Sequence, residues 1–186
     1  MAEVPFDLNP IVNIRGIDRY RPSMEEVRGL GWSIGEAVMR SSFRIDQIVA
    51  ITRGGLTPAD CISRSMGIKD IQTLAIERYE AEPDDSSNPV QVEEFKIYRL
   101  PKLKKLGSRA LFVDDIVDKA MTAEFVQERW PQAAIASIYT KLEHDESLEK
   151  VDFYGKYVGD IWVDLPWEVE EQNRSELRQE PNRAIY

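Results

Sequence analysis

Apolar positions recur along this chain with two different periods, one of strands and one of helices. Uninterrupted β-branched and other apolar residues at 47–52 and 110–113 are typical of strands that are buried on both faces of a sheet. Predicted strands comprise residues 47–52, 71–79, 92–100, 110–113, 134–140, 153–158 and 160–163.

Between several of these strands, apolar residues recur every three or four positions and predict helices. The first helix is expected within residues 23–40. It opens with a capping box, in which Ser23 and Glu26 can each satisfy one free amide of the first turn. A second helix is expected to end at Gly67, and a third occupies about 121–129. This alternation predicts an α/β fold whose parallel sheet is covered on both faces, with ligands at the carboxyl ends of its strands.

The flanks of the chain differ from its centre. Residues 1–22 lack clear periodicity and are expected to form an N-terminal arm, while the polar residues 169–186 are expected to form a C-terminal tail. The domain between them comprises residues 23–168. Within it, residues 80–89 are acidic and rich in turn formers, which predicts an exposed loop. This loop could bind a cation, but we expect residues 80–100 to form a small hood over the site.

Composition excludes several functional classes. A net charge of −9 disfavours general affinity for a nucleic-acid backbone or an anionic membrane surface. Cys61 is the only cysteine, so no internal disulfide can form and a reducing compartment is expected. The N-terminal residues lack the basic flank and apolar stretch of a signal peptide, and no apolar run reaches the roughly 20 residues that span a bilayer. We therefore expect a cytoplasmic protein with no nucleic-acid or membrane partner.

The strongest candidate for chemistry is the end of the strand at 110–113. This strand delivers Asp114 and Asp115 to one place, and Asp118 follows just before a predicted helix. Adjacent carboxylates are costly to hold together unless hydroxyls, a cation or free amides meet them. The helix start supplies amides and a partial positive charge that suit phosphate. On spacing alone, however, simple capping of the next helix explains the three acids equally well.

Four segments carry a resemblance to a known family. Residues 110–122 (ALFVDDIVDKAMT) resemble the motif of type I phosphoribosyltransferases that binds phosphoribosyl pyrophosphate (PRPP). Residues 51–59 (ITRGGLTPA) resemble the pyrophosphate loop of the same family. Residues 139–141 and 160–168 resemble the base-binding segments of its xanthine-guanine branch and archaeal relatives. The resemblance implies the type I fold: a central parallel sheet with helices on both faces and a small hood.

The resemblance also implies roles for the acidic residues. Asp114 and Asp115 would hold the ribose hydroxyls of PRPP and help to bind Mg²⁺ on its diphosphate, because Mg²⁺ takes one or two carboxylates together with substrate phosphates and water. Asp118 would manage the proton of the attacking nitrogen of the base. Arg53, with the amides of Gly54 and Gly55, would receive the pyrophosphate, and a cis peptide is often found in that loop.

For the base, the resemblance implies stacking on Trp162, a contact from Ile161, and recognition by Lys141. Because a lysine ammonium only donates hydrogen bonds, Lys141 would accept a 6-oxo group and disfavour the 6-amino group of adenine. Without the resemblance, Trp162 would be interpreted as a core aromatic residue, and Lys141 as a solvated strand end.

The phosphate loop departs from the family pattern. The family usually has threonine, glycine, a variable residue and threonine there, where this chain has Lys119, Ala120, Met121 and Thr122. Alanine restricts the backbone and methionine adds bulk, while Lys119 brings a positive charge that can compensate. The other interpretation is that the loop binds PRPP weakly or holds a different anion.

The resemblance implies an enzyme that transfers ribose 5-phosphate from PRPP to guanine, xanthine or hypoxanthine, requires Mg²⁺ and forms a homo-oligomer. The alternative is a non-catalytic PRPP-sensing or regulatory protein with the same fold, which the altered loop favours. Retention of Arg53, Asp118, Lys141 and Trp162 opposes this alternative, because a sensor needs no base pocket.

Overall fold

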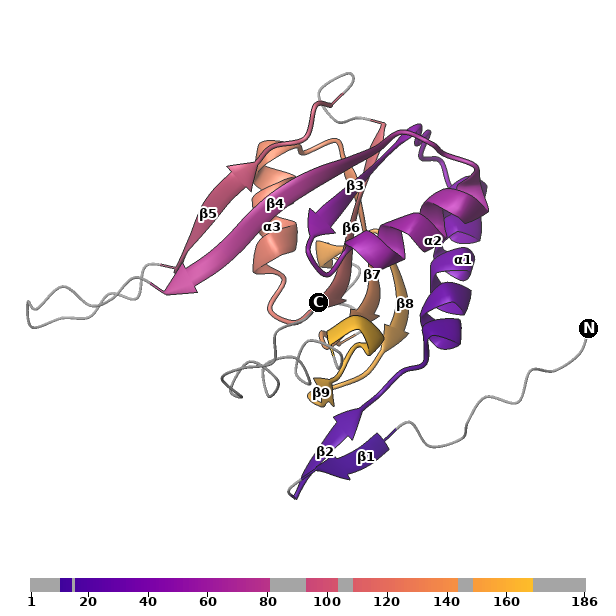
Figure 1. The fold of residues 1–186 in the computed structure, drawn as a ribbon. Coiled ribbons are helices and arrows are strands. Elements are labelled where there is room, and N and C mark those ends of the chain that lie inside the picture. Colours follow the sequence, from indigo (N-terminus) through magenta and orange to yellow (C-terminus); the bar gives the residue numbers. More distant parts are fainter. Residues whose placement is uncertain (1–10, 15, 81–92, 104–108, 144–148, 169–186) are drawn as a thin grey trace, which may run out of the picture.

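A computed structural model describes residues 11–14, 16–80, 93–103, 109–143 and 149–168 (Figure 1). The helices are α1 (Met24–Arg40), α2 (Leu56–Met66) and α3 (Met121–Arg129). The strands are β1 (Ile11–Ile14), β2 (Ile17–Tyr20), β3 (Gln47–Thr52), β4 (Ile71–Glu80), β5 (Glu93–Arg99), β6 (Ala110–Val117), β7 (Ala134–Thr140), β8 (Phe153–Tyr157) and β9 (Trp162–Val163). None of the described helices is long and apolar enough to cross a membrane.

Six strands form the main sheet, in the order β5-β4-β3-β6-β7-β8. All neighbours are parallel except β5, which runs antiparallel to β4 at one edge. The chain passes from β3 outward to β4, and later from β6 outward in the other direction to β7 and β8. The strand order therefore reverses between β3 and β6, which is the place where open parallel sheets bind ligands.

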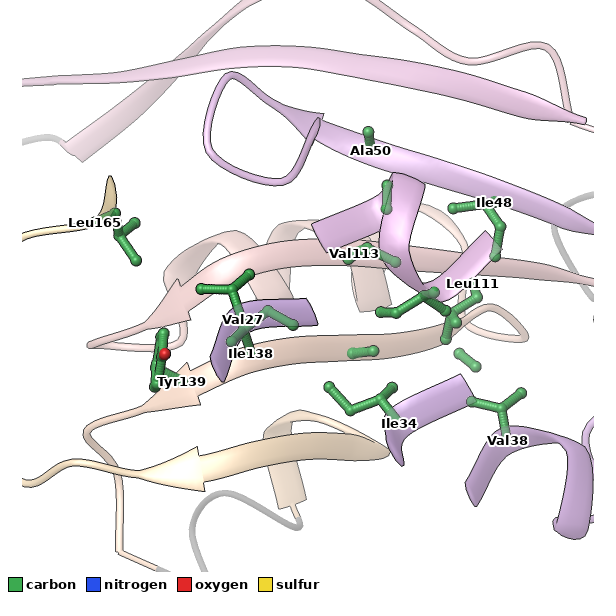
Figure 2. Packing of buried hydrophobic residues seen from close by; sticks show 14 of the residues in the cluster. Val27, Ile34, Val38, Ile48, Ala50, Leu111, Val113, Ile138, Tyr139 and Leu165 are labelled. Atoms are coloured by element: carbon green, nitrogen blue, oxygen red, sulfur yellow. The ribbon is translucent and has the colours of Figure 1, made fainter. Parts of the chain in front are cut away.

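Side chains of β3 alternate between the two faces of this sheet. Ile48 and Ala50 pack with α1 and α2, whereas Val49 and Ile51 pack with α3. Figure 2 shows the first of these two cores, in which Val27, Ile34 and Val38 of α1 meet the sheet. Burial on both faces explains why β3 and β6 are nearly continuous apolar runs. The predicted α/β architecture is confirmed.

Most predicted elements lie within about one residue, at each end, of where the sequence placed them, and the differences at β6 and β9 matter most for the site. β6 continues past Val113 to Val117, so that Asp114 and Asp115 belong to the strand itself. β9 contains only Trp162 and Val163, although residues 160–163 were predicted.

The N-terminal arm contains a β-hairpin that the sequence analysis missed. β1 and β2 pair antiparallel, and the Asn13 side-chain oxygen accepts a hydrogen bond from the Gly16 amide at 3.0 Å. β2 also pairs in parallel with β9, which makes a second, three-stranded sheet from the two ends of the described chain. This small sheet lies beyond the carboxyl ends of β7 and β8 (Figure 1).

The hood expected at residues 80–100 is only partly described. Its described strands, β4 and β5, extend the main sheet, so the smaller of the two described sheets lies elsewhere, at β1, β2 and β9. Residues 81–92, like the predicted tail at 169–186, lie outside the described residues.

Only half of the predicted capping box at α1 is confirmed. The Ser23 hydroxyl accepts a hydrogen bond from the Glu26 amide at 3.1 Å, as expected. The Glu26 side chain, however, turns away from Ser23 into a buried polar cluster. The Glu26 carboxylate therefore binds residues from other parts of the fold instead of the Ser23 amide.

Candidate functional site

The acidic pair of β6 lies at the point where the strand order reverses. Asp114 accepts a hydrogen bond from the Asp115 amide at 3.0 Å, and Asp115 accepts one from the Ile116 amide at 2.8 Å. Burial raises the pKa of both carboxyls, and the charge of Asp115 raises the pKa of Asp114 further. A cation beside the pair would offset both effects, so these residues fit a bound divalent ion.

The donor set also indicates which kind of ion fits. No group of three or more potential metal-ligating histidine, cysteine or acidic side chains gathers among the described residues. Two carboxylates without further protein ligands suit Mg²⁺, which keeps waters and substrate phosphates as its other ligands.

The loop between β3 and α2 lies directly against the acidic pair. Its Thr52–Arg53 peptide is cis, as the resemblance implied. A β-carbon at Gly54 would lie 1.9 Å from Asp115 Oδ2, and one at Gly55 would lie 2.1 Å from the Val113 carbonyl oxygen. Any larger residue would therefore push the loop away from β6. The two glycines bring the predicted pyrophosphate loop and the predicted ribose-binding acids into contact.

The phosphate loop keeps an unusual backbone conformation despite its altered sequence. Ala120 has φ of 57° and ψ of 2°, in the left-handed region where glycine is normal. Ala120 is also the N-cap residue of α3, and no side chain caps the helix there. The free amides of the first turn are thus available to an anion.

A cavity of about 670 Å³ opens in front of this loop. It is lined by residues 116–123 together with Asp114 and Trp162. The structure therefore brings the phosphate loop and the predicted stacking residue to one cavity, although they lie far apart in the sequence.

Three predicted base-site residues converge from different segments. Lys141 Nζ lies 3.4 Å from Asp118 Oδ2 and 5.9 Å from the centre of the Trp162 ring. Trp162 is 57% exposed, so its interpretation as a core aromatic residue is wrong. The Lys141 side chain is only 14% exposed, so it is not a solvated strand end either.

The predicted roles of two further residues rest on the resemblance alone. Ile161 is partly buried and packs against the apolar core, so a side-chain contact with a base stays a prediction. Arg53 is exposed on the loop after β3, and its contact with pyrophosphate likewise stays a prediction.

The sequence analysis missed Arg19, which the hairpin places beside the base site. The Arg19 guanidinium carbon lies 5.6 Å from the centre of the Trp162 ring, and its Nη1 lies 2.8 Å from Asp164 Oδ1. Arg21 Nε lies 2.9 Å from the other oxygen of the same carboxylate. Burial by itself would raise the pKa of Asp164, but the hydrogen bonds from Arg21 and Arg19 outweigh it and lower the pKa.

A sequence signal for this hairpin does exist. β-branched residues at 11, 12, 14 and 17 flank Gly16, a residue type that favours turns. That pattern alone could have predicted the hairpin, although it contains no hint of the partner strand β9.

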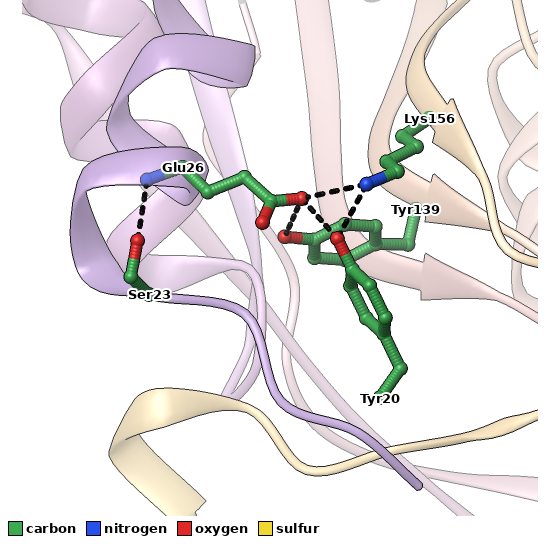
Figure 3. Close-up of polar contacts among 5 residues, drawn as sticks. All are labelled: Tyr20, Ser23, Glu26, Tyr139 and Lys156. Carbon is green, nitrogen blue, oxygen red and sulfur yellow. Dashed lines mark hydrogen bonds and ion pairs between the residues drawn. The ribbon is translucent and has the colours of Figure 1, made fainter. Parts of the chain in front are cut away.

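A buried cluster around Glu26 joins the hairpin to the main sheet (Figure 3). The Glu26 carboxylate accepts hydrogen bonds from the hydroxyls of Tyr20 and Tyr139 and from Lys156 Nζ. Burial, with the nearby Glu26 carboxylate, raises the pKa of both tyrosines, so both stay neutral donors at ordinary pH. Since Tyr20 follows Arg19 and Tyr139 precedes Lys141 by two residues, the cluster fixes both sides of the base site relative to each other.

Comparison with known proteins agrees with this fold. Residues 17–172 match the model of the phosphoribosyl transferase domain. The chain belongs to the phosphoribosyltransferase family.

Among curated relatives, the xanthine-guanine phosphoribosyltransferase of Gluconobacter oxydans is 37% identical over 122 residues, which are 65% of this chain and 67% of the relative. The enzyme of the same name from Idiomarina loihiensis is 30% identical over 122 residues, which are 66% of this chain and 70% of the relative.

Solved structures show the same fold. A hypothetical protein from Neisseria gonorrhoeae with bound ppGpp has a TM-score of 0.67 at 20% identity, covering 87% of this chain and 97% of its own. The purine phosphoribosyltransferase of Pyrococcus horikoshii has a TM-score of 0.63 at 19% identity, covering 91% and 99%. At such identities the likeness concerns the fold alone.

Proposed function

We propose that this protein transfers ribose 5-phosphate from PRPP to a 6-oxopurine base, namely guanine, xanthine or hypoxanthine, and releases pyrophosphate. The observation that carries the proposal is the convergence of Asp118, Lys141 and Trp162 beside the acidic pair of β6. The names of the curated relatives, which are xanthine-guanine phosphoribosyltransferases, support the same substrate class.

PRPP would bind along the loops at the carboxyl ends of β3 and β6. The 5-phosphate would meet the free amides at the start of α3, with Lys119 and Thr122 beside them. Asp114 and Asp115 would hold the ribose hydroxyls. The diphosphate would lie toward the Arg53–Gly55 loop, because that loop touches Asp115.

Mg²⁺ would be held by Asp114 and Asp115, whose raised pKa values suit a neighbouring cation. When bound, it supplies positive charge that stabilises pyrophosphate as a leaving group. Arg53 would add a further positive charge from the protein itself.

The base would stack on the exposed Trp162 ring and be oriented by Lys141 and Asp118. The 6-oxo oxygen and N7 of a purine are neighbours on one edge, and the ammonium of Lys141 and the carboxylate of Asp118 are neighbours at 3.4 Å. Lys141 can donate to the oxygen, while Asp118 can accept a proton from the imidazole ring. Adenine would face Lys141 with an amino group, which also donates and is therefore disfavoured.

The reaction would be a displacement at the anomeric carbon of ribose. A bond from the base nitrogen forms as the bond to pyrophosphate breaks, and positive charge develops on the ribose ring. The chain's own contributions are orientation of the two substrates, donors to the departing oxygens and a proton acceptor at Asp118.

The alternative of a PRPP sensor rests on the substituted loop at 119–121. The left-handed conformation of Ala120 weighs against it, because the backbone adopts the path that glycine would allow. We also propose a homo-oligomer, because such assemblies are usual in the family, and a cytoplasmic location, because a single cysteine fits a reducing compartment.

The decisive experiment is a base panel. The protein is incubated with PRPP, Mg²⁺ and guanine, xanthine, hypoxanthine or adenine, and the nucleotide formed is measured. We expect turnover with the 6-oxopurines, and strong loss of it in Asp118→Asn. Best use of adenine would contradict the role of Lys141, and PRPP binding without turnover of any base would favour the sensor.

A further inference from the structure

The small sheet places Arg19 and the predicted stacking residue, Trp162, on one of its faces. In the parallel pairing of β2 with β9, Arg19 is opposite Trp162 and Tyr20 is opposite Val163. Because side chains alternate along a strand, Tyr20 and Val163 point together to the other face, where both are buried in the core. The same alternation leaves Arg19 and Trp162 side by side on the face outside that core.

Arg19 is held firmly in this place. Its Nη1 donates to Asp164 Oδ1 at 2.8 Å, and the Asp164 side chain has no exposed surface. The register is fixed as well, because the Asp164 amide donates to the Tyr20 carbonyl oxygen at 2.8 Å. A guanidinium bound to a buried carboxylate loses most of its freedom, so its position relative to the Trp162 ring is set by the fold.

Trp162, in contrast, is poorly held by the core. More than half of its surface is exposed, at 57%. The cations within reach of its ring, among the described residues, are Arg19 at 5.6 Å and Lys141 at 5.9 Å. Both distances allow a cation–π interaction. Lys141 is expected to turn toward the base, which leaves Arg19 as the fixed neighbour of the indole.

We propose that Arg19 is a positioning residue of the base site, which holds the Trp162 ring in the orientation that stacks on a purine. The inference rests on the proposed base-binding function. It makes the N-terminal hairpin a functional part of the site, since the hairpin carries Arg19 and is fastened to the main sheet through Tyr20 and the Glu26 cluster (Figure 3).

Arg21 offers a matched control. It donates to the same carboxylate, Asp164, at 2.9 Å, and is a residue of the same kind two positions further on. Its guanidinium is not among those within cation–π range of Trp162 in the described part of the chain. Arg19→Ala and Arg21→Ala therefore both remove one ion pair with Asp164, but only the former removes the contact with the indole.

The test compares KM for guanine, KM for PRPP and kcat in the wild type and the two variants. Arg19→Ala should raise KM for guanine roughly two- to fivefold, the range of an exposed cation–π contact, and leave KM for PRPP unchanged. Arg21→Ala should leave both constants near those of the wild type. An unchanged KM for guanine in Arg19→Ala, or an equal rise in both variants, would overturn the inference.

A double-mutant cycle separates action through Trp162 from direct contact with the base. In a Trp162→Leu background, Arg19→Ala should cause no further rise in KM for guanine. An additive rise would mean that Arg19 acts independently of the ring. If Arg19→Ala does not fold, Arg19→Lys replaces it. Lysine keeps the positive charge but not the planar guanidinium, so a smaller rise in KM for guanine is expected.

Guanine binding, measured by calorimetry together with turnover, distinguishes failure of the proposed base-binding function from failure of the role proposed for Arg19. A wild type that neither binds nor converts any base would remove the proposed function and this inference with it. If the wild type converts guanine but the Arg19→Ala variant keeps the wild-type KM for guanine, only the role proposed for Arg19 is contradicted.

Discussion

Gly54 and Asp115 touch across the point where the strand order reverses: a β-carbon on Gly54 would lie 1.9 Å from Asp115 Oδ2. The loop after β3 and the acids of β6 therefore cannot move independently. Since Asp115 is also partly buried and accepts a hydrogen bond from the Ile116 amide, the loop has little room to yield.

Gly54→Ala should accordingly displace the Asp115 carboxylate and weaken PRPP binding. A ligand that binds only the folded state raises the melting temperature, so the shift produced by PRPP with Mg²⁺ should shrink strongly in this variant. Gly29→Ala is the control, because a β-carbon at Gly29 meets nothing within 4 Å. Its shift should equal that of the wild type, and an equally full shift in Gly54→Ala would contradict the role of the contact.

The acidic pair itself should be essential for PRPP binding. Asp114→Asn with Asp115→Asn removes both charges while keeping shape, so PRPP and Mg²⁺ should no longer raise the melting temperature. Removal of Mg²⁺ by a chelator should reduce the wild-type shift in the same direction. Asp60→Asn, on the exposed face of α2, should keep the full shift. A full shift in the double variant would place PRPP elsewhere.

Lys141 should set the choice of base. Glutamine at this position offers both a donor and an acceptor, so Lys141→Gln should narrow the preference for guanine over adenine, measured as the ratio of kcat/KM values. Lys69→Gln serves as the control because Lys69 is exposed just before β4, at the opposite end of the sheet from the site. If the ratio is the same in Lys141→Gln and the wild type, Lys141 does not read the 6-position.

Ala120 should lower the stability of the fold slightly. A left-handed backbone at φ of 57° costs a residue with a β-carbon about 1 kcal/mol, a cost that glycine avoids. Ala120→Gly should thus raise the free energy of unfolding by about that amount in urea titrations. Ala37→Gly, in the right-handed α1, should lower it by about 1 kcal/mol. A loss of stability in both variants would mean that the conformation of Ala120 carries no such cost.

The ion pairs of Asp164 should make stability depend on pH. Its folded-state pKa is lowered, so these pairs stabilise the protein above the ordinary carboxyl pKa of about 4 and lose this effect as pH falls through the folded-state value. The free energy of unfolding of Asp164→Asn should therefore fall below that of the wild type at pH 6, and the gap should narrow toward pH 3. A gap that stays constant over this range would show that charge at Asp164 does not matter.

Much of the fold follows from local patterns. The run at 47–52 is apolar because β3 is buried on both faces, and the spacing in α1 reflects one apolar face. The acids at 114, 115 and 118 were predicted to belong to the site from the resemblance of residues 110–122 to the PRPP-binding motif, since their spacing alone left helix capping equally possible. These conclusions needed no knowledge of which distant residues meet.

Contacts between distant segments could not be predicted in this way. Glu26 has the position of a capping-box residue, yet its carboxylate binds three partners from β2, β7 and β8 instead of the Ser23 amide. Ala120 was expected to restrict the loop, but the fold around it imposes a left-handed conformation. In both cases a local preference worth about 1 kcal/mol was outweighed by tertiary interactions.

The sequence by itself determined the α/β class and the family, and it predicted the acids, the glycine loop and the base-site residues, because each of these motifs lies within a few consecutive positions. Only the tertiary structure decided that Arg19 lies beside Trp162 and pairs with Asp164. Arg19 and Asp164 are 145 positions apart, and no periodicity in either segment specifies the other. Their pairing arises from the register of β2 on β9, which is fixed by burial of Tyr20 and Val163 on the opposite face.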